Sequence, residues 1–462
     1  MFRALSLLFL SLIISHSALA DQTKINTQIQ KLEDSYKTLS TEFYADVKSY
    51  SFASKKEFTD IDELLLAVNK LNDSNQSIAA IQLINFNIQT VKENIDTKAV
   101  FQIVELLLDK NEWKLANTLF KKIKDEGDKS LLATIQFKFA KYHAQRNEWP
   151  EVNKLLDGFI TELSEENAAY ALLLNGSALQ HLKKHRQAVE NYNKVKPTSQ
   201  YYSYAQLNTA IANIRQGWWT DAQTKIQDLI FQYNKTNEDE LTNRLYLVLG
   251  YALLQREYYR DARESFRHIG LESRYTNRAL LGIGLTATSQ GDFVGGLNAL
   301  TILKNKKTSD LSVDESYLLV PYVYEKLQQE LTVTTTYTEA MNYYQRRTTN
   351  LENIAKNRSD FNKLLFNPNT SSFIIENNNF DYTNRYPDSF IKNYKRLVEF
   401  KTVSKSKKLQ TKINKIIKRF DATYQQVVAD LANQRIEYLK SYLNQSRYGL
   451  ARLYDNTKET NN

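Results

Sequence analysis

Apolar residues recur along this chain on two scales, the turn of a helix and a longer period of about 36 residues. On the longer scale a small or slender residue returns, and bulky apolar residues follow it four and seven positions later in most copies. Offsets of four and seven place side chains on one stripe of a helix. The recurring positions are Ala79, Ala116, Val152, Ala188, Ala222, Ala262, Gly296 and Ala340, with spacings of 37, 36, 36, 34, 40, 34 and 44. Self-similarity at such a period predicts a solenoid of repeated units.

Each unit of this period predicts two helices joined by a tight turn. Another small residue lies twelve positions before the recurring one, for example Gly176, Gly250 and Gly284. An aromatic residue comes shortly before the recurring position in most copies, and all four tryptophans of the chain, Trp113, Trp149, Trp218 and Trp219, lie in this frame. Small residues facing large ones allow two helices to pack closely. We therefore assign the tryptophans to packing rather than to a ligand cage.

One copy shows the pattern most fully, with Leu249-Gly250-Tyr251-Ala252 followed by Tyr258-Tyr259-Arg260-Asp261-Ala262 and then Phe266. This fragment resembles the tetratricopeptide repeat, in which a tryptophan, a leucine-glycine pair and a tyrosine precede alanine, phenylalanine and proline at set distances. The resemblance extends from about Ile61 to Tyr344. It implies an all-α fold, a right-handed solenoid of antiparallel helix pairs with additional N-terminal and C-terminal helices.

The segments outside the repeats have their own patterns. Residues 21–60 contain an amphipathic stripe that predicts a helical arm, acting as a cap or as one strand of a coiled coil. The solenoid is expected at 61–345, followed by a helix end and a linker loop at 346–393, where proline and asparagine break the helical period. The period returns at 394–455, which predicts a long helical region, and the polar residues 456–462 predict a disordered tail.

The first twenty residues indicate the compartment. Arg3 precedes an apolar run from Ala4 to Leu10 that continues to Ile14, and Ala18-Leu19-Ala20 precedes Asp21. This order predicts a secretory signal peptide with a small-x-small cleavage site, because the run is too short to span a bilayer. The sequence contains no cysteine, which argues against a lipoprotein and a disulfide scaffold. We expect a periplasmic bacterial protein that does not span the membrane after cleavage, with secretion as the alternative.

The net charge of +9 is spread over the chain, with one local departure. Between Lys401 and Arg419 the sequence has eight basic residues and no acidic one, and an apolar stripe runs through the same segment. The basic surface comprises Lys405, Lys407, Lys408, Lys412, Lys415, Lys418 and Arg419. A basic amphipathic helix can lie on an anionic membrane or bind a polyanion. The pattern favours the simpler interpretation, a solvated face of a helix whose apolar side packs against a neighbour.

Motifs for catalysis or cofactor binding are missing from the sequence. There is no nucleophile elbow, phosphate-binding loop or HExxH motif. His181 and His185 have the spacing that puts two ligands on one helical face, but no third ligand stands at a metal-motif distance. We therefore expect no metal, no cofactor and no enzymatic activity.

The resemblance to tetratricopeptide repeats implies that the first helix of each unit faces a groove that binds an extended or helical peptide. The candidate binding residues on these helices are Tyr170, Gln180, His181, Tyr204, Arg215, Arg244, Tyr251 and Arg278. Tyrosine and arginine are enriched in binding hot spots. Two functions remain open: a scaffold or adaptor for proteins of the cell envelope, or a binder of a non-protein polymer such as peptidoglycan, exported polysaccharide or anionic lipid. Neither involves nucleic acid.

Overall fold

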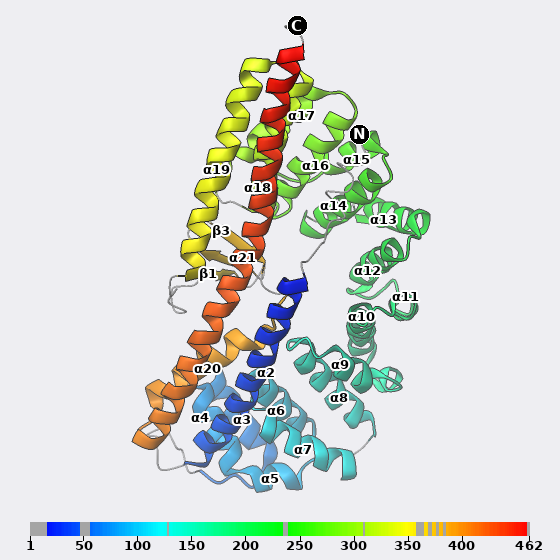
Figure 1. The fold of residues 1–462 in the computed structure, drawn as a ribbon. Coiled ribbons are helices and arrows are strands. Elements are labelled where there is room, and N and C mark those ends of the chain that lie inside the picture. The colour runs from blue at the N-terminus through cyan, green and yellow to red at the C-terminus, as the bar shows by residue number, and fades with distance from the viewer. Residues whose placement is uncertain are drawn as a thin grey trace. The chain divides into compact units, whose positions relative to one another are not determined.

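The computed structural model describes residues 16–46, 56–126, 129–233, 239–307, 310–356, 365–367, 372–375, 378–381 and 385–459. Its chain of helices is drawn in Figure 1. The first half contains α2 (His16–Ala45), α3 (Ile61–Asp73), α4 (Ser77–Phe86), α5 (Ile88–Glu93), α6 (Lys98–Asp109), α7 (Trp113–Glu126), α8 (Lys129–Ala144), α9 (Trp149–Leu156), the short 3-10 helix η2 (Ile160–Glu162), α10 (Glu165–His181) and α11 (His185–Tyr192). Residues 1–15 of the predicted signal peptide lie outside the described residues, and α2 includes the predicted cleavage site.

Helices also dominate the second half. They are α12 (Tyr202–Arg215), α13 (Trp219–Tyr233), α14 (Asp239–Gln255), α15 (Tyr259–Arg267), α16 (Thr276–Ser289), α17 (Phe293–Lys304), α18 (Leu311–Lys326), α19 (Glu330–Lys356), α20 (Ser389–Val403) and α21 (Lys407–Glu459). Three short strands, β1 (Leu365–Asn367), β2 (Ser372–Ile375) and β3 (Asn378–Asp381), lie between α19 and α20. The last three residues of the predicted disordered tail, 460–462, lie outside the described residues, and the four before them continue α21.

The chain folds as two compact units, each made of separate stretches of sequence. Unit 1 combines residues 1–25, 213–385 and 423–462, and unit 2 combines residues 26–212 and 386–422. Unit 2 therefore contains most of α2, the helices from α3 to α11, α20 and the start of α21. Unit 1 contains α13 to α19, the three strands and the remainder of α21.

One turn geometry joins the two helices of every pair. A residue with a left-handed backbone stands in each turn, at Asn75, Asn111, Asn147, Lys183, Gly217, Glu257, Gly291 and Gln328. The amide that follows it donates back to the carbonyl five positions earlier, as from Glu112 to Leu107 at 2.7 Å and from Asp292 to Ala287 at 2.9 Å. This is the Schellman motif, which satisfies carbonyls at the end of the first helix. Different residues form one turn in eight places, so the repeat follows from backbone geometry more than from residue identity.

The left-handed residues fix the register of the repeat. The residue five positions after each is buried, and these residues are Ala80, Ala116, Val152, Ala188, Ala222, Ala262, Gly296 and Val333. Six of the eight match the positions predicted from the sequence, whereas Ala80 replaces Ala79 and Val333 replaces Ala340. The last turn is as tight as the others, since Gln328 is its left-handed residue and α19 begins two residues later, at Glu330. A run of threonines follows inside α19. Their hydroxyls donate to carbonyls one turn back, as from Thr334 to Glu330 at 3.1 Å.

The small residues of the first helices face the bulky residues of the second, as the spacing predicts. A Cβ added to Gly176 would lie 2.3 Å from Tyr192, and one added to Gly284 would lie 2.5 Å from Leu300. Phe266 is enclosed from two sides, because added Cβ atoms at Gly250 and at Gly282 of the following helix would lie 2.5 and 2.4 Å from its ring. The helix backbones approach too closely there for any side chain. The structure confirms the predicted all-α solenoid of antiparallel helix pairs.

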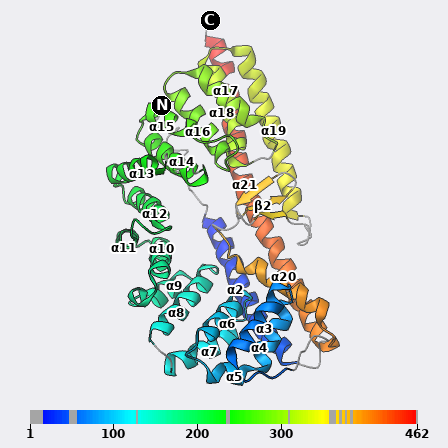
Figure 2. The ribbon, with the colours of Figure 1, turned by 180° about the vertical axis from the view of Figure 1, so that it is seen from behind.

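In unit 2, the helices from the two ends of the chain pack together on the repeats. The predicted stripe of α2 is buried in full at Ile25, Ile29, Leu32, Tyr36 and Leu39. Phe43 of α2 stacks on Phe400 of α20 with centroids 4.0 Å apart, and Phe390 of α20 stacks on Phe420 of α21 at 5.2 Å. Figures 1 and 2 show α2 beside α20 from both sides. Helix α20 and the start of α21 thus form a hairpin with α2 against it.

In unit 1, α21 packs along α18 and α19 and a small sheet accompanies them. The ring of Tyr442 on α21 lies 5.8 Å from that of Tyr344 on α19, and the two helices run side by side in both ribbon views. The strands form an antiparallel sheet in the order β1-β2-β3, with Phe373 opposite both Phe366 and Phe380. The sequence predicts a linker loop at 346–393 because proline and asparagine break the helical period, whereas the structure has three short strands there and begins α20 at Ser389. Strands of three or four residues are too short to show an alternating apolar pattern.

Candidate functional site

Two of the predicted binding residues of unit 2, Tyr170 and Tyr204, lie near the starts of successive first helices, where other aromatic side chains gather. Tyr170 of α10 stacks on Tyr201 with centroids 5.0 Å apart and meets the ring edge of Phe137 of α8 at 5.7 Å. Tyr204, at the start of α12, is 46% exposed. The three rings in contact come from successive repeats, so a ladder of aromatic side chains crosses the first helices of unit 2.

His181 and Gln180 end the same helix, α10, and have different roles. His181 is exposed and stacks flat on Trp149, with centroids 4.1 Å apart and planes 3° from parallel. Gln180 is buried, and its amide donates to the Tyr192 hydroxyl at 3.0 Å and to the Asn208 carbonyl at 3.1 Å. The geometry makes His181 available to a partner and assigns Gln180 to packing between repeats.

The other four predicted binding residues belong to unit 1. The hydroxyl of Tyr251 donates to the backbone carbonyl of Arg278 at 2.8 Å, and the Arg278 guanidinium lies 5.5 Å from the Tyr251 ring centroid. Burial raises the pKa of Tyr251, so its hydroxyl stays protonated. Arg215 and Arg278 are exposed and Arg244 is half-buried. The structure thus brings Tyr251 and Arg278 into one contact between adjacent first helices.

The predicted basic surface is exposed on α21 and on the link before it. All seven of its predicted side chains are exposed. The apolar side of the same helix is packed, since Ile413 and Phe420 are 0% exposed and Leu409 is 5% exposed. Lys412 pairs with Glu42 of α2 at 2.5 Å, and Arg419 donates to the Ser35 hydroxyl at 3.2 Å. The structure therefore agrees with the simpler interpretation of this segment, a helix packed on its apolar side and solvated on its basic side.

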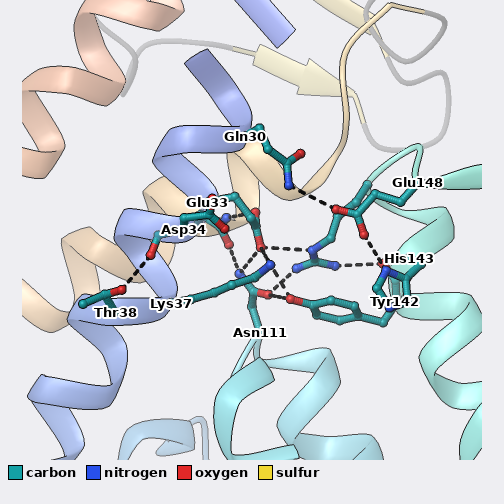
Figure 3. Close-up of polar contacts among 11 residues, drawn as sticks. Gln30, Glu33, Asp34, Lys37, Thr38, Asn111, Tyr142, His143 and Glu148 are labelled. Carbon is teal, nitrogen blue, oxygen red and sulfur yellow. Dashed lines mark hydrogen bonds and ion pairs between the residues drawn. The ribbon is translucent and has the colours of Figure 1, made fainter. Parts of the chain in front are cut away.

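A buried polar network, absent from the sequence prediction, lies where α2 and α20 meet the repeats of unit 2. Glu33 of α2 is 4% exposed and accepts from Nε of Arg146 at 3.0 Å and from the Asn393 amide. Asn111, the left-handed residue of the α6–α7 turn, accepts from the Tyr142 hydroxyl at 2.8 Å and from Arg146. Figure 3 shows Glu33, Asn111 and Tyr142 directed toward one another.

The contacts of this network are structural. The Arg146 guanidinium lies over the Tyr142 ring, 3.3 Å from its centroid, and burial raises the pKa of Tyr142. Every partner is an internal group, so the network pins α2 and α20 to two turns of the solenoid. The sequence carries one signal for it: Glu33 lies four residues after Ile29, on the stripe that the helical pattern buries.

A second network has the same function in unit 1. Asp314 of α18 is 0% exposed and accepts from Nε of Arg435 on α21 at 2.7 Å and from the Tyr343 hydroxyl at 2.7 Å. Nε of Arg347 lies 3.9 Å from the same carboxylate, and this arginine also donates to the side chain of Asn378 on β3. The network ties α18, α19, β3 and α21 together.

A cavity of about 300 Å³ opens between α2, α4 and the start of α7 in unit 2. Lys37, Glu112 and Trp113 line it, with Lys37 placed over the Trp113 ring at 5.1 Å. Glu112 accepts from the Ser40 hydroxyl, and burial raises its pKa to about 7 against the opposing charge of Arg396. Glu112 therefore titrates near neutral pH, although its contacts are with the helices that hold it.

Within the described part of the chain, no group of three or more histidine, cysteine, aspartate or glutamate side chains could hold a metal ion. His181 and His185 do not form a site there, because His181 stacks on Trp149 and His185 begins the next helix. A search of the described helices finds none that combines the length and apolar character needed to cross a membrane.

The chain is similar in fold to several solved structures at low sequence identity. It resembles the apo form of RapI (12% identity, TM-score 0.45, 64% of this chain and 89% of that one). It also resembles a tetratricopeptide repeat protein from Parabacteroides merdae (13%, TM-score 0.37, 56% and 98%) and the apo form of the quorum sensor NprR from B. thuringiensis (9%, TM-score 0.35, 72% and 98%). No family model and no curated protein sequence matches the chain.

These likenesses concern the fold alone, since identities and TM-scores are low. The resemblance to tetratricopeptide repeats predicted from the sequence is confirmed, and it is supported most directly by the helix pairs and the recurring turn of the chain itself.

Proposed function

We propose that the protein is a non-enzymatic scaffold of the bacterial cell envelope that binds a segment of a partner protein on the first helices of its repeats. The observation that carries this proposal is the aromatic surface of unit 2, which comprises the stacked Tyr170 and Tyr201 with the exposed Tyr204 and, at the other end of α10, the stacked pair His181 and Trp149. Aromatic rings that stay partly exposed on a rigid support are typical hot spots of protein interfaces.

The helix pairs support this proposal because they hold the rings in place. Tyr170 and Tyr201 are fixed by stacking, so little side-chain entropy is lost when a partner covers them. Tyr204 and His181 remain exposed at opposite ends of successive first helices, Tyr204 near the start of α12 and His181 at the end of α10. An extended or helical peptide with apolar and aromatic side chains has the chemistry to cover this surface.

The proposed location rests on residues 1–20. An N-terminal leader with an apolar run and Ala18-Leu19-Ala20 supports export and cleavage before Asp21, which gives a periplasmic protein or, as the alternative, a secreted one. Cell fractionation and mass spectrometry of the mature N-terminus test this location. A cytosolic chain that retains Met1 would contradict it.

Crosslinking in living cells, followed by co-purification, tests the scaffold function. We expect a defined set of proteins to co-purify with the wild type and to be lost from the Tyr204→Ala and His181→Ala variants. Tyr258→Ala is the matched control, because Tyr258 is 52% exposed but lies at a turn rather than on a first helix. Equal recovery from all three variants would contradict binding at the aromatic surface.

A second candidate function is the binding of a non-protein anionic polymer or lipid of the envelope. The exposed basic side of α21 favours it, since six basic side chains of α21 and Lys405 just before it follow one another without an acidic residue between them. Retention on isolated sacculi, exported polysaccharide or anionic lipid, with no protein recovered by crosslinking, would favour this candidate over the first.

A further inference from the structure

The excess positive charge of the chain is concentrated on one short segment of unit 2. Residues 386–422 contain eleven basic and three acidic side chains, an excess of eight, whereas the whole chain has an excess of nine. Ten of the eleven basic side chains are exposed, and Arg396 is the buried one. The rest of the molecule is therefore almost neutral, and α20 with the start of α21 forms its basic region.

The basic side chains of α21 lie on one side of the helix. At 3.6 residues per turn, the six basic residues from Lys407 to Arg419 fall within an arc of about 140° over a length of about 18 Å. None of Lys405, Lys407, Lys408, Lys415 and Lys418 forms an ion pair with another described residue. Five ammonium groups are thus close together, exposed, and not neutralised by the described fold.

The apolar side of this helix is already occupied. Ile413 and Phe420 are 0% exposed, and Phe420 stacks on Phe390 of α20. An amphipathic helix that inserts into a bilayer needs its apolar face free to enter the headgroup boundary. The basic surface of α21 can therefore bind a ligand through charge but cannot insert.

The amino-acid composition of the basic surface indicates which class of ligand it can bind. Lysine is a hydrated point charge that attracts anions without fixed geometry, whereas arginine favours bidentate recognition of single groups. Residues 401–419 contain seven lysines, one arginine and no aromatic residue. Proteins bind single-stranded nucleic acid with basic residues for the backbone and aromatic side chains on which the bases stack. This surface has the basic residues and no aromatic side chain.

We propose that the basic surface of α21 binds the headgroups of anionic phospholipids by adsorption, without insertion of the helix. Basic clusters next to a membrane are held by the negative potential of the lipid surface, which falls off within a Debye length. The inference specifies the ligand of the second candidate function and is independent of peptide binding at the aromatic surface. It places unit 2 at the membrane while Tyr204 and His181 belong to the proposed peptide site.

Co-sedimentation of the full mature chain with vesicles tests the inference. The vesicles are phosphatidylcholine alone and phosphatidylcholine mixed with phosphatidylglycerol, at low and high salt. We expect binding to the mixed vesicles only, and loss of that binding at high salt. Replacement of Lys408, Lys415 and Lys418 by Gln should weaken binding about a hundredfold, since each basic residue contributes about five-fold.

The matched control replaces three other exposed lysines of unit 2, Lys70, Lys121 and Lys194, by Gln. It removes the same charge from elsewhere on the unit, and we expect binding to the mixed vesicles to weaken by less than about five-fold. Equal loss in both triple variants would show a general charge effect and overturn the proposal, as would binding to neutral vesicles.

Failure of the inference can be told apart from failure of the second candidate function. The same chain is tested on isolated sacculi and on an anionic polysaccharide in parallel. Retention on either polymer with no binding to phosphatidylglycerol vesicles overturns the lipid proposal and leaves the candidate function standing. No retention on any of the three overturns both.

Discussion

The two compact units hold the helices at the chain ends by the same chemistry with the charges exchanged. In unit 2 the buried carboxylate belongs to the end helix, as Glu33 of α2, and the arginine belongs to the repeats, as Arg146 of the α8–α9 turn. In unit 1 the carboxylate belongs to the repeats, as Asp314 of α18, and the arginine to the end helix, as Arg435 of α21. Tyrosine and asparagine side chains complete each network, with Tyr142, Asn111 and Asn393 in unit 2 and Tyr343 and Asn378 in unit 1.

The two networks differ in where their second cation comes from. Glu33 is bonded to Arg146 and has the ammonium of Lys37, on its own helix α2, at 3.8 Å. Asp314 is bonded to Arg435 and has Nε of Arg347, on another helix, α19, at 3.9 Å. A buried ion pair contributes little net stability, but removal of one partner is strongly destabilising because a charge remains buried. Each network therefore fixes where an end helix docks, and the Asp314 carboxylate joins three helices, α18, α19 and α21.

The largest expected effect follows the loss of a network carboxylate. Asp314→Asn should lower the free energy of unfolding of unit 1 by about 3 to 5 kcal/mol, because Arg435 loses its counter-charge while 5% exposed. Glu33→Gln should fall at the lower end of this range, because Arg146 keeps its bonds to Asn111 and to the Tyr142 carbonyl. Urea unfolding followed by hydrogen exchange in each unit measures both losses.

A compensating variant controls this prediction. Adding Arg435→Met to Asp314→Asn should recover part of the loss, because the buried charge of Arg435 is removed together with its partner. Equal unfolding free energies for the wild type, Asp314→Asn and Glu33→Gln would contradict the proposed role of the networks.

A smaller effect depends on pH and again has one residue in each unit. Burial raises the pKa of Glu315 to about 7, with the Tyr442 hydroxyl opposing, and that of Glu112 to about 7, with Arg396 opposing. A raised carboxyl pKa gives stability that is complete below the ordinary value of 4.5 and is lost as pH rises through 7. Stability should therefore fall between about pH 5 and 7.

Glutamine at these positions removes that loss. Glu315→Gln should stabilise the protein by about 2 to 3 kcal/mol at pH 8 and leave it little changed at pH 5. Glu112→Gln should gain less, because it also removes the attraction to Arg396. Thermal unfolding across this pH range measures how steeply stability falls with pH. A dependence of stability on pH that neither variant changes would refute the prediction.

Close packing between helices gives the next effect. Gly250→Ala should destabilise unit 1 by about 1 to 2 kcal/mol, because its Cβ would lie 2.5 Å from Phe266, while the better helix propensity of alanine offsets about 1 kcal/mol. Gly176→Ala gives the same test against Tyr192 in unit 2. Gly270→Ala is a control that meets no atom within 4 Å. Chemical denaturation should show a smaller loss of unfolding free energy for the control than for the other two variants.

The smallest effect is expected at the surface. Lys412→Gln should change stability by less than about 1 kcal/mol, because Lys412 and Glu42 are 46% and 44% exposed. Arg452→Gln in unit 1 should have a larger effect, about 1 to 2 kcal/mol, because Arg452 reaches both carboxylate oxygens of Glu325 and the pair is less exposed. A larger loss of stability for Lys412→Gln than for Arg452→Gln in chemical denaturation would contradict this prediction.

The binding surfaces and the networks differ in how much of them the sequence predicts. The stripe of α2 and the basic arc of α21 follow from helical spacing, and the structure has both. Gln180 has the spacing of a groove residue yet is buried, because Tyr192 and Asn208 bond to its amide. Exposure of a residue on a first helix depends on the neighbouring repeat, and one helix pattern does not contain that information.

The sequence by itself determined the solenoid, because each helix pair leaves an apolar face that the next pair covers, and this need recurs as a period. It located six of the eight buried positions of the repeat, and missed Ala80 and Val333, where only the left-handed turn fixes the register. The helical pattern places Glu33 on a buried stripe, but only the tertiary structure decided which residues join each network. Asn111 and Asn393 are 282 positions apart, and nothing in the local pattern around either residue indicates that the other is its partner.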